Sequence, residues 1–245
     1  MKRTEFWQST LSNTLGTIIG IVLTFGTTLV LQRCERVKTE RTTALMVIHH
    51  LEYYCETLEE DIALLQMQDS LNRVVWDHWP DRYDQIPDDT LQLFLNGLTM
   101  RSFVANDNTV ESIFSSNIDT WKSVGSSEFI ELAGKCFSAT HLISQIREEM
   151  DEWKQQNYKT LMQTTVYTDH PTNTLAETTA RVFCSPELCS FIKIQRNTYI
   201  PTLQMGLNII RDYNEKNKQL MHVTDSDLEQ FGFHEHKNYE TTQPL

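Results

Sequence analysis

Apolar side chains recur at alternating spacings of three and four residues along two long segments of the chain. The first stripe begins at Ala44 and ends at Leu65, inside a stretch from Gln32 to Trp79 that holds no Gly or Pro. A period of 3.5 residues, kept for about three heptads or more, predicts long helices that pack side by side in a bundle or coiled coil. The first stripe is Ala44, Ile48, Leu51, Cys55, Leu58, Ile62 and Leu65, and the second is Phe129, Leu132, Cys136, Ala139, Ile143, Ile146, Met150, Trp153 and Asn157.

The starts of two long helices are predicted from capping residues. Ser126 or Ser127 is expected to cap the helix of the second stripe. A third helix is expected to open at Ser185, with Pro186 in the first helical position, where a missing N–H costs little. Pro201 should kink this third helix, because it removes a backbone donor and clashes with the preceding turn. The third helix carries on one face Leu188, Ile192, Tyr199, Ile209, Tyr213 and Leu220.

Shorter elements are expected between the long helices. Asp88 or Asp89 is the predicted cap of a short helix with an apolar side, and Asn108 begins a motif that resembles a capping box. Residues 70–87 are expected to form a loop, and residues 164–184 a connection or a short helix. The apolar residues of the first short helix are Leu91, Phe94, Leu95 and Leu98.

The chain is therefore expected to be all-α, with three parts. Residues 1–32 would form a tail and a transmembrane anchor, 33–222 an acidic four-helix-like bundle into which the anchor helix continues, and 223–245 a polar tail. Only 8 Gly and 6 Pro occur in 245 residues, which argues against a turn-rich β-fold. A hydrophobic content of 40% is enough to build a core.

The anchor is predicted from a stretch without charged residues. No Asp, Glu, Lys or Arg occurs from Gln8 to Gln32, and the apolar centre runs from Leu15 to Leu31. Crossing a bilayer takes about 17–25 mainly apolar helical residues, so this stretch is long enough. No small-residue cleavage site follows Leu31, which argues against a cleaved signal peptide.

The orientation of the anchor follows from the basic residues on its two sides. Two basic residues precede it and four follow it between Arg33 and Arg41, which favours a cytoplasmic bundle. Glu35 and Glu40 lie in the same downstream cluster and weaken that preference, so a periplasmic bundle is the alternative.

Small residues recur on one side of the predicted anchor. Gly16, Gly20, Thr24 and Thr28 are spaced four apart and form one ridge on a helix. Helices associate in lipid where small residues let their backbones approach closely. The ridge therefore predicts that the chain forms a homo-oligomer through its anchor.

Charge and motifs exclude several functions and assign no chemistry. With 33 acidic and 21 basic residues the net charge is -12, which argues against a nucleic-acid partner. No nucleophile elbow or phosphate-binding loop occurs, so neither a catalytic residue nor a cofactor is assigned.

His49 and His50, close to Glu52, are interpreted as packing or surface residues rather than metal ligands. The five cysteines lack the spacing of a disulfide framework and are interpreted as small buried hydrophobes.

Three aromatic residues in the predicted loop are the only candidate binding patch. Trp76, Trp79 and Tyr83 either plug one end of the bundle or form an exposed binding surface. The plug is favoured, because exposed apolar patches of that size are uncommon.

The chain also resembles a family of bacterial, mainly Bacteroidetes-type, proteins with one N-terminal anchor and a helical remainder, a family without an established activity. The resemblance implies the architecture and a location in the bacterial inner membrane. It is carried by three segments, GIVLTFGTTLVLQRCERVKTER, NTVESIFSSNIDTWKSVGSSEFIELAGKCF and SPELCSFIKIQRNTYIPTLQMGLNIIRDYNEKNKQL.

Two functional hypotheses follow, and both are non-enzymatic. The first is a single-pass membrane protein whose helical bundle associates with a second copy or with another protein, as a scaffold or regulator. The second is an anchored sensor that binds a ligand in the bundle and signals through the helix at 32–68. An enzyme is disfavoured, because the usual catalytic motifs are absent from the sequence.

Overall fold

The computed structural model describes residues 2–80, 82–100, 124–166 and 174–231, with side chains described for 32–80, 82–100, 124–163 and 174–231. This part of the chain is helical and contains no strand, so the predicted all-α class is confirmed for it. The elements are α1 (Lys2–Asp77), a 3-10 turn (Tyr83–Gln85), α2 (Asp88–Thr99), α5 (Ser127–Val166), α6 (Leu175–Cys184), α7 (Pro186–Ile194), a π-helical turn (Gln195–Tyr199) and α8 (Ile200–Met221).

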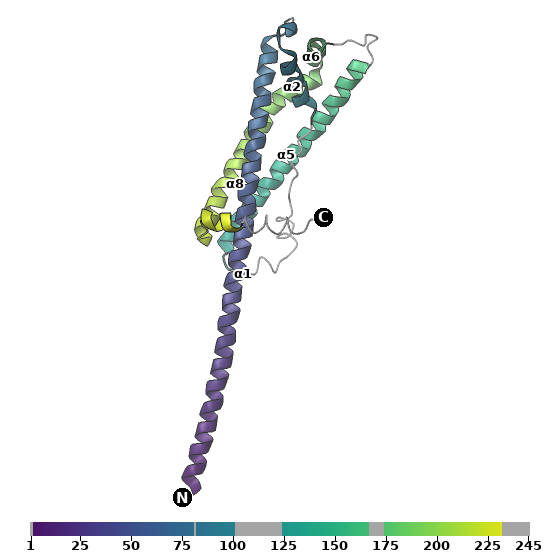
Figure 1. The fold of residues 1–245 in the computed structure, drawn as a ribbon. Helices are drawn as coiled ribbons and strands as arrows, with labels where there is room; N and C mark the ends of the chain where they lie inside the picture. Colours follow the sequence, from purple (N-terminus) through teal and green to yellow (C-terminus); the bar gives the residue numbers. More distant parts are fainter. Residues whose placement is uncertain (1, 81, 101–123, 167–173, 232–245) are drawn as a thin grey trace, which may run out of the picture.

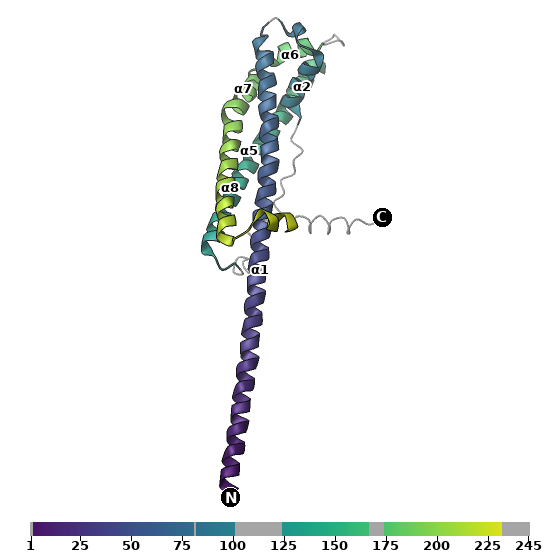
Figure 2. The same cartoon turned by 60° about the vertical axis from the view of Figure 1, so that its left-hand side comes forward.

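Three long helices, α1, α5 and α8, run the length of the bundle (Figure 1). α1 and α5 point the same way, and α8 returns antiparallel and packs along both of them. α5 leans away from α1 toward the end of the bundle far from the N-terminus, and α2 and α6 fill the space that opens there (Figures 1 and 2). The first half of α1 projects from the opposite end, and residues 32–42 on this projection are exposed or half-exposed.

The core is built from the two predicted stripes. All seven members of the first stripe are buried on α1, as expected from their spacing. On α5 the second stripe is buried at six of its nine positions, and Ala139, Ile146 and Trp153 are partly buried against the core. The α1 stripe continues past Leu65, because Asp69 and Asn72 are buried in the same register.

The predicted third helix is interrupted rather than simply kinked. A π-helical turn at Gln195–Tyr199 separates α7 from α8, and the Ile200 N–H donates to the Gln195 carbonyl, five residues earlier. Pro201 follows directly and lies in the first turn of α8, where its missing N–H is tolerated. The irregularity is therefore not a kink caused by Pro201 but a wide π-helical turn before it, which adds one residue to the helical register.

The predicted face of the third helix needs correction beyond this turn. Ile209 and Tyr213 are only partly buried, whereas Ile210, Asn214 and Asn217 are fully buried. The π-helical turn changes the phase of the helix, and two core positions are filled by Asn. A prediction from apolar spacing alone therefore selects Ile209 and Tyr213, which are adjacent in sequence to the buried residues Ile210 and Asn214.

Helix ends agree with prediction at some positions and differ at others. Ser126 and Ser185 cap α5 and α7 as expected, accepting from the N–H groups of Phe129 and Leu188. α2 starts after Pro87 without a side-chain cap, so Asp88 and Asp89 lie in its first turn and the predicted cap is wrong.

The predicted loop at 70–87 is shorter than expected. α1 continues to Asp77, because Asn72 and Val75 remain buried in the bundle. Of the two possibilities for 164–184, the short helix is found as α6. Its capping box joins Thr174 and Glu177.

The predicted tail packs on the bundle over its first residues. His222 ends α8 in the left-handed conformation, with a φ of 51°. Val223 and Leu228 are buried in the main core, and residues 225–231 are helical.

Several sequence predictions fall outside the described residues. Among the helices whose side chains are described, none is both long and apolar enough to cross a membrane. The predicted anchor at 1–32, with its ridge of Gly16, Gly20, Thr24 and Thr28, lies almost wholly outside those side chains, and only its helical backbone is described. The motif at Asn108 also lies outside the described part.

Candidate ligand pocket

A pocket of about 560 Å³ lies in the far half of the bundle, where α5 diverges from α1. Ligand sites commonly have volumes of about 300–1,000 Å³, so this space suits a small molecule. One wall comes from α1, a second from α2 and a third from α5, and Leu203 of α8 contributes to the lining. The α1 wall consists of Asp61, Leu64, Leu65, Met67, Gln68 and Leu71.

Much of the lining is apolar and open to solvent. Leu64 and Met67 on α1 are 49% and 50% exposed, and Leu93 and Met100 at α2 are 51% and 53% exposed. Scattered exposed apolar residues are ordinary, but these four line the same cavity. Methionine side chains are flexible and adapt to ligands of different shape.

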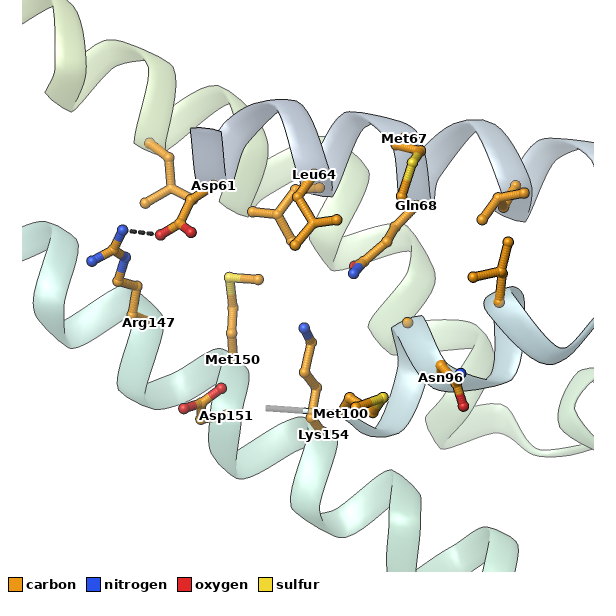
Figure 3. Close-up of a pocket in the computed structure, with 15 residues that line it drawn as sticks. Asp61, Leu64, Met67, Gln68, Asn96, Met100, Arg147, Met150, Asp151 and Lys154 are labelled. Carbon is orange, nitrogen blue, oxygen red and sulfur yellow. Dashed lines mark hydrogen bonds and ion pairs between the residues drawn. The ribbon is translucent and has the colours of Figure 1, made fainter. Parts of the chain in front are cut away.

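The end of the pocket toward the N-terminal half of α1 is closed by an ion pair. Asp61 of α1 pairs with Arg147 of α5, and both side chains are nearly buried (Figure 3). Burial raises the pKa of the Asp61 carboxyl, while the Arg147 guanidinium acts against that rise. Arg147 also lies over the ring of Tyr54, with its central carbon 5.9 Å from the ring centroid. The pair joins two helices that diverge just beyond it.

A lysine occupies the interior of the pocket. Lys154 of α5 is only 4% exposed, and Figure 3 shows its side chain extending from α5 toward α1, beside Met150. Across the described residues, no hydrogen bond or ion pair engages its amine. Desolvation lowers the pKa of Lys154, while the carboxylates of Asp151 and Asp61 act in the opposite direction. Within the described part of the chain, this ammonium group therefore feels two carboxylates but forms an ion pair with neither.

The α1 wall is fixed to the π-helical turn by polar contacts. Arg196 donates through Nε to Asp69 at 2.6 Å, and Gln195 donates to the side-chain oxygen of Gln68 at 3.3 Å. Gly97 lets α2 approach this wall closely, since a Cβ there would lie 3.2 Å from Cγ of Gln68. Gln68 is thereby held between the turn and α2.

The predicted aromatic patch lies outside this pocket. Trp76, Trp79 and Tyr83 surround Phe183 of α6, with ring centroids 5.1, 5.3 and 5.8 Å from it. Tyr83 is buried, while Trp76 and Trp79 keep 42% and 41% of their surface exposed. The cluster packs α6 against the far end of α1, an arrangement that favours the plug over the binding patch.

The other sequence candidates are separate from the pocket. The ring of His49 lies edge-on to Phe231 at 5.5 Å, and Glu52 accepts from Lys218 at 3.2 Å. Within the described ranges, no group of three or more potential ligands is suited to a metal ion. All five cysteines are unpaired. Cys55 and Cys136 are buried as interpreted, but Cys34 and Cys184 are exposed, so the interpretation as buried hydrophobes is wrong for those two.

The sequence contains one signal for this pocket that apolar spacing overlooked. The alternation from Ile143 to Asn157 can also be continued through Arg147, Met150 and Lys154, at spacings of four and three. The structure buries Lys154 more deeply than its apolar neighbour Trp153. Charged residues at positions where the spacing predicts a buried helix face, such as Arg147 and Lys154, therefore indicate the pocket. Which residues of α1 and α2 lie opposite them depends on the tertiary fold.

No protein-family model matches this chain, and neither the curated proteins nor the solved structures contain a significant match. The resemblance seen in the sequence therefore remains an expectation, and the function must be argued from the pocket and from α1.

Proposed function

We propose that this chain is a single-pass protein of the bacterial inner membrane whose four-helix-like bundle binds a small ligand and transmits its presence through α1. The observation that carries the proposal is that six pocket residues lie on α1, the helix that continues to Lys2 without interruption. A ligand that changes the position of this wall acts directly on the helix leading to the predicted anchor.

The anchor in this proposal is supported by the sequence. The stretch from Gln8 to Gln32 has no charged residue, and the basic cluster that follows suits an anionic membrane surface. The excess of Lys and Arg after the anchor favours a cytoplasmic bundle over a periplasmic one. A transmembrane position of this segment is part of the proposal.

Coupling between the pocket and α1 is tested by cross-linking at a native cysteine. Cys34 is exposed on the projecting part of α1, just beyond the predicted anchor. The full chain with Cys184→Ser is oxidised in membranes, and the yield of the Cys34-linked dimer is measured. Leu64→Trp, which fills the pocket mouth in place of a ligand, should change the dimer-to-monomer ratio by about fivefold or more, the lower range of allosteric coupling.

Met205→Trp is the matched control, because Met205 is an exposed residue of α8 that does not line the pocket. It should leave the yield unchanged. Equal yields for Leu64→Trp and the unfilled chain would contradict coupling. Recovery of the full chain in the soluble fraction without detergent would contradict the anchor.

A second candidate function is a scaffold that associates through α1 regardless of the pocket. Its support is the exposure of residues 32–39, which precede the first contacts of α1 with the bundle and have a surface available to another copy or another protein. This candidate predicts a high yield of the Cys34-linked dimer that neither Trp substitution alters. The same oxidation experiment therefore separates the two functions.

A further inference from the structure

The interior of the pocket combines a buried cation with apolar walls. Lys154 is only 4% exposed, and its amine points into the space between α1 and α5 (Figure 3). A buried ammonium that forms no ion pair is costly, because the water that solvated it has been removed. A ligand with an anionic group at this position would offset that cost.

Other charged groups at the pocket have a different role. Asp61 and Arg147 neutralise each other at one end. Asp151 stays near the α5 backbone in Figure 3, is half-buried, and takes part in another interaction. Lys154 is thus the charge that points into the cavity and is available to a ligand.

The remainder of the cavity selects an apolar body. Four half-exposed apolar residues line the same cavity as the lysine, namely Leu64, Met67, Leu93 and Met100. Burial of apolar ligand surface on these side chains stabilises the complex, because it removes that surface from water. A strongly polar anion would leave this surface in water.

We propose that the pocket binds a single-chain amphiphile with a carboxylate head, such as a long-chain fatty acid, with the head on the Lys154 amine and the chain along Leu64, Met67, Leu93 and Met100. This inference rests on the proposed ligand-binding function and names the ligand class. One buried cation matches one carboxylate, and the open apolar side accommodates a chain longer than the cavity.

The inference is tested with photoreactive probes on the full chain in phosphatidylcholine nanodiscs. A diazirine-bearing palmitic acid and its methyl ester are cross-linked over a range of concentrations. Labelling of peptides that contain Met100 or Met150 is quantified by mass spectrometry. The acid should label them at a concentration about tenfold or more below that of the ester, since a charge-assisted hydrogen bond adds at least that much affinity.

Lys154→Met removes the charge and keeps the length of the side chain. It should weaken labelling by the acid about tenfold or more, so that acid and ester become equal, and should leave ester labelling unchanged. Lys159→Met, at an exposed position of the same helix, should behave like the parent chain. Lys154→Met is expected to fold, because it removes a buried charge, and Lys154→Gln serves as a second uncharged variant.

Three outcomes would overturn the inference. They are equal labelling by acid and ester in the parent chain, acid labelling that Lys154→Met and Lys154→Gln leave unchanged, and absence of label from the pocket peptides. Equal labelling by both probes that Leu64→Trp blocks would reject the carboxylate and retain a ligand pocket. The Cys34 dimer yield uses no probe, so the proposed coupling is judged independently.

Discussion

Single residues set how closely the long helices approach. Gly206 of α8 lies against Ile143 of α5, and a Cβ at this position would be 2.7 Å from the Ile143 Cδ1 atom. Ile143 is 1% exposed and has little room to move. The small residue therefore permits the close packing of α5 and α8 that forms one side of the core.

Gly206→Ala should accordingly destabilise the protein relative to a matched glycine substitution. Gly134 on α5 is the control, because a Cβ there meets no atom within 4 Å. Both changes gain about 1 kcal/mol of helix propensity, but only Gly206→Ala adds overpacking of about 1–3 kcal/mol. Urea unfolding of the full chain in non-ionic detergent should show that difference in the free energy of unfolding. Equal stabilities would mean that Ile143 moves aside freely.

At the scale of elements, α1 is unusual because this single helix contributes to three different parts of the molecule. Its far end forms the pocket wall, its middle carries the buried stripe, and residues 32–39 are exposed before the bundle begins. The π-helical turn between α7 and α8 holds the pocket wall through Arg196 and Asp69. A displacement of that wall would therefore move both α1 and the π-helical turn.

The first part of α1 carries a prediction of its own. A membrane reporter of helix dimerisation bearing residues 9–34 should give a signal that Gly16→Ile with Gly20→Ile lowers strongly. Branched side chains on the ridge would keep the two backbones apart, and lipid offers no hydrophobic compensation for that loss. Ile18→Leu, off the ridge, is the control and should retain the signal. An undiminished signal in the double Ile variant would remove the case for this ridge.

The whole molecule has an uneven distribution of charge and of buried ionisable groups. Residues 1–41 contain six basic and three acidic residues, and the remainder contains 15 basic and 30 acidic residues. Within the bundle, burial raises the pKa of the Cys55 and Cys136 thiols to about 12 and that of the Tyr54 phenol to about 12. The folded state favours the neutral forms of these three groups.

The stability of the whole bundle should therefore fall in alkaline solution. The two thiols titrate near 9 when unfolded, so their contribution is complete below that pH and is lost between about 9 and 12. Lys154 has a lowered pKa and contributes in the opposite direction, as its penalty disappears with rising pH.

Unfolding by urea between pH 8 and 11 should show this loss of stability. Cys55→Ala with Cys136→Ala should lower the overall stability through cavities and give a shallower pH dependence than the parent chain. A parallel pH dependence in both proteins would show that the thiols do not contribute.

The sequence predicted the long helices and the pocket only in part. Ala44 to Leu65 were correctly assigned to the core, because their spacing returns them to one helix face whatever they contact. The spacing failed on α8, where the π-helical turn shifts the phase and Asn214 and Asn217 occupy core positions. It also gave no reason to join Lys154 to Leu64 or Leu93, which lie far away in the chain.

Local interactions account for what the sequence by itself determined: the all-α class, the caps at Ser126 and Ser185, and the buried stripes. Each depends on residues within one or two helical turns, so the order of residues is sufficient to predict it. The tertiary structure alone decided that α5 diverges from α1, that α2 lines the opening, and that Lys154 lies within it. Those features depend on how separate helices pack, because a pocket is formed by side chains that only the three-dimensional arrangement brings together.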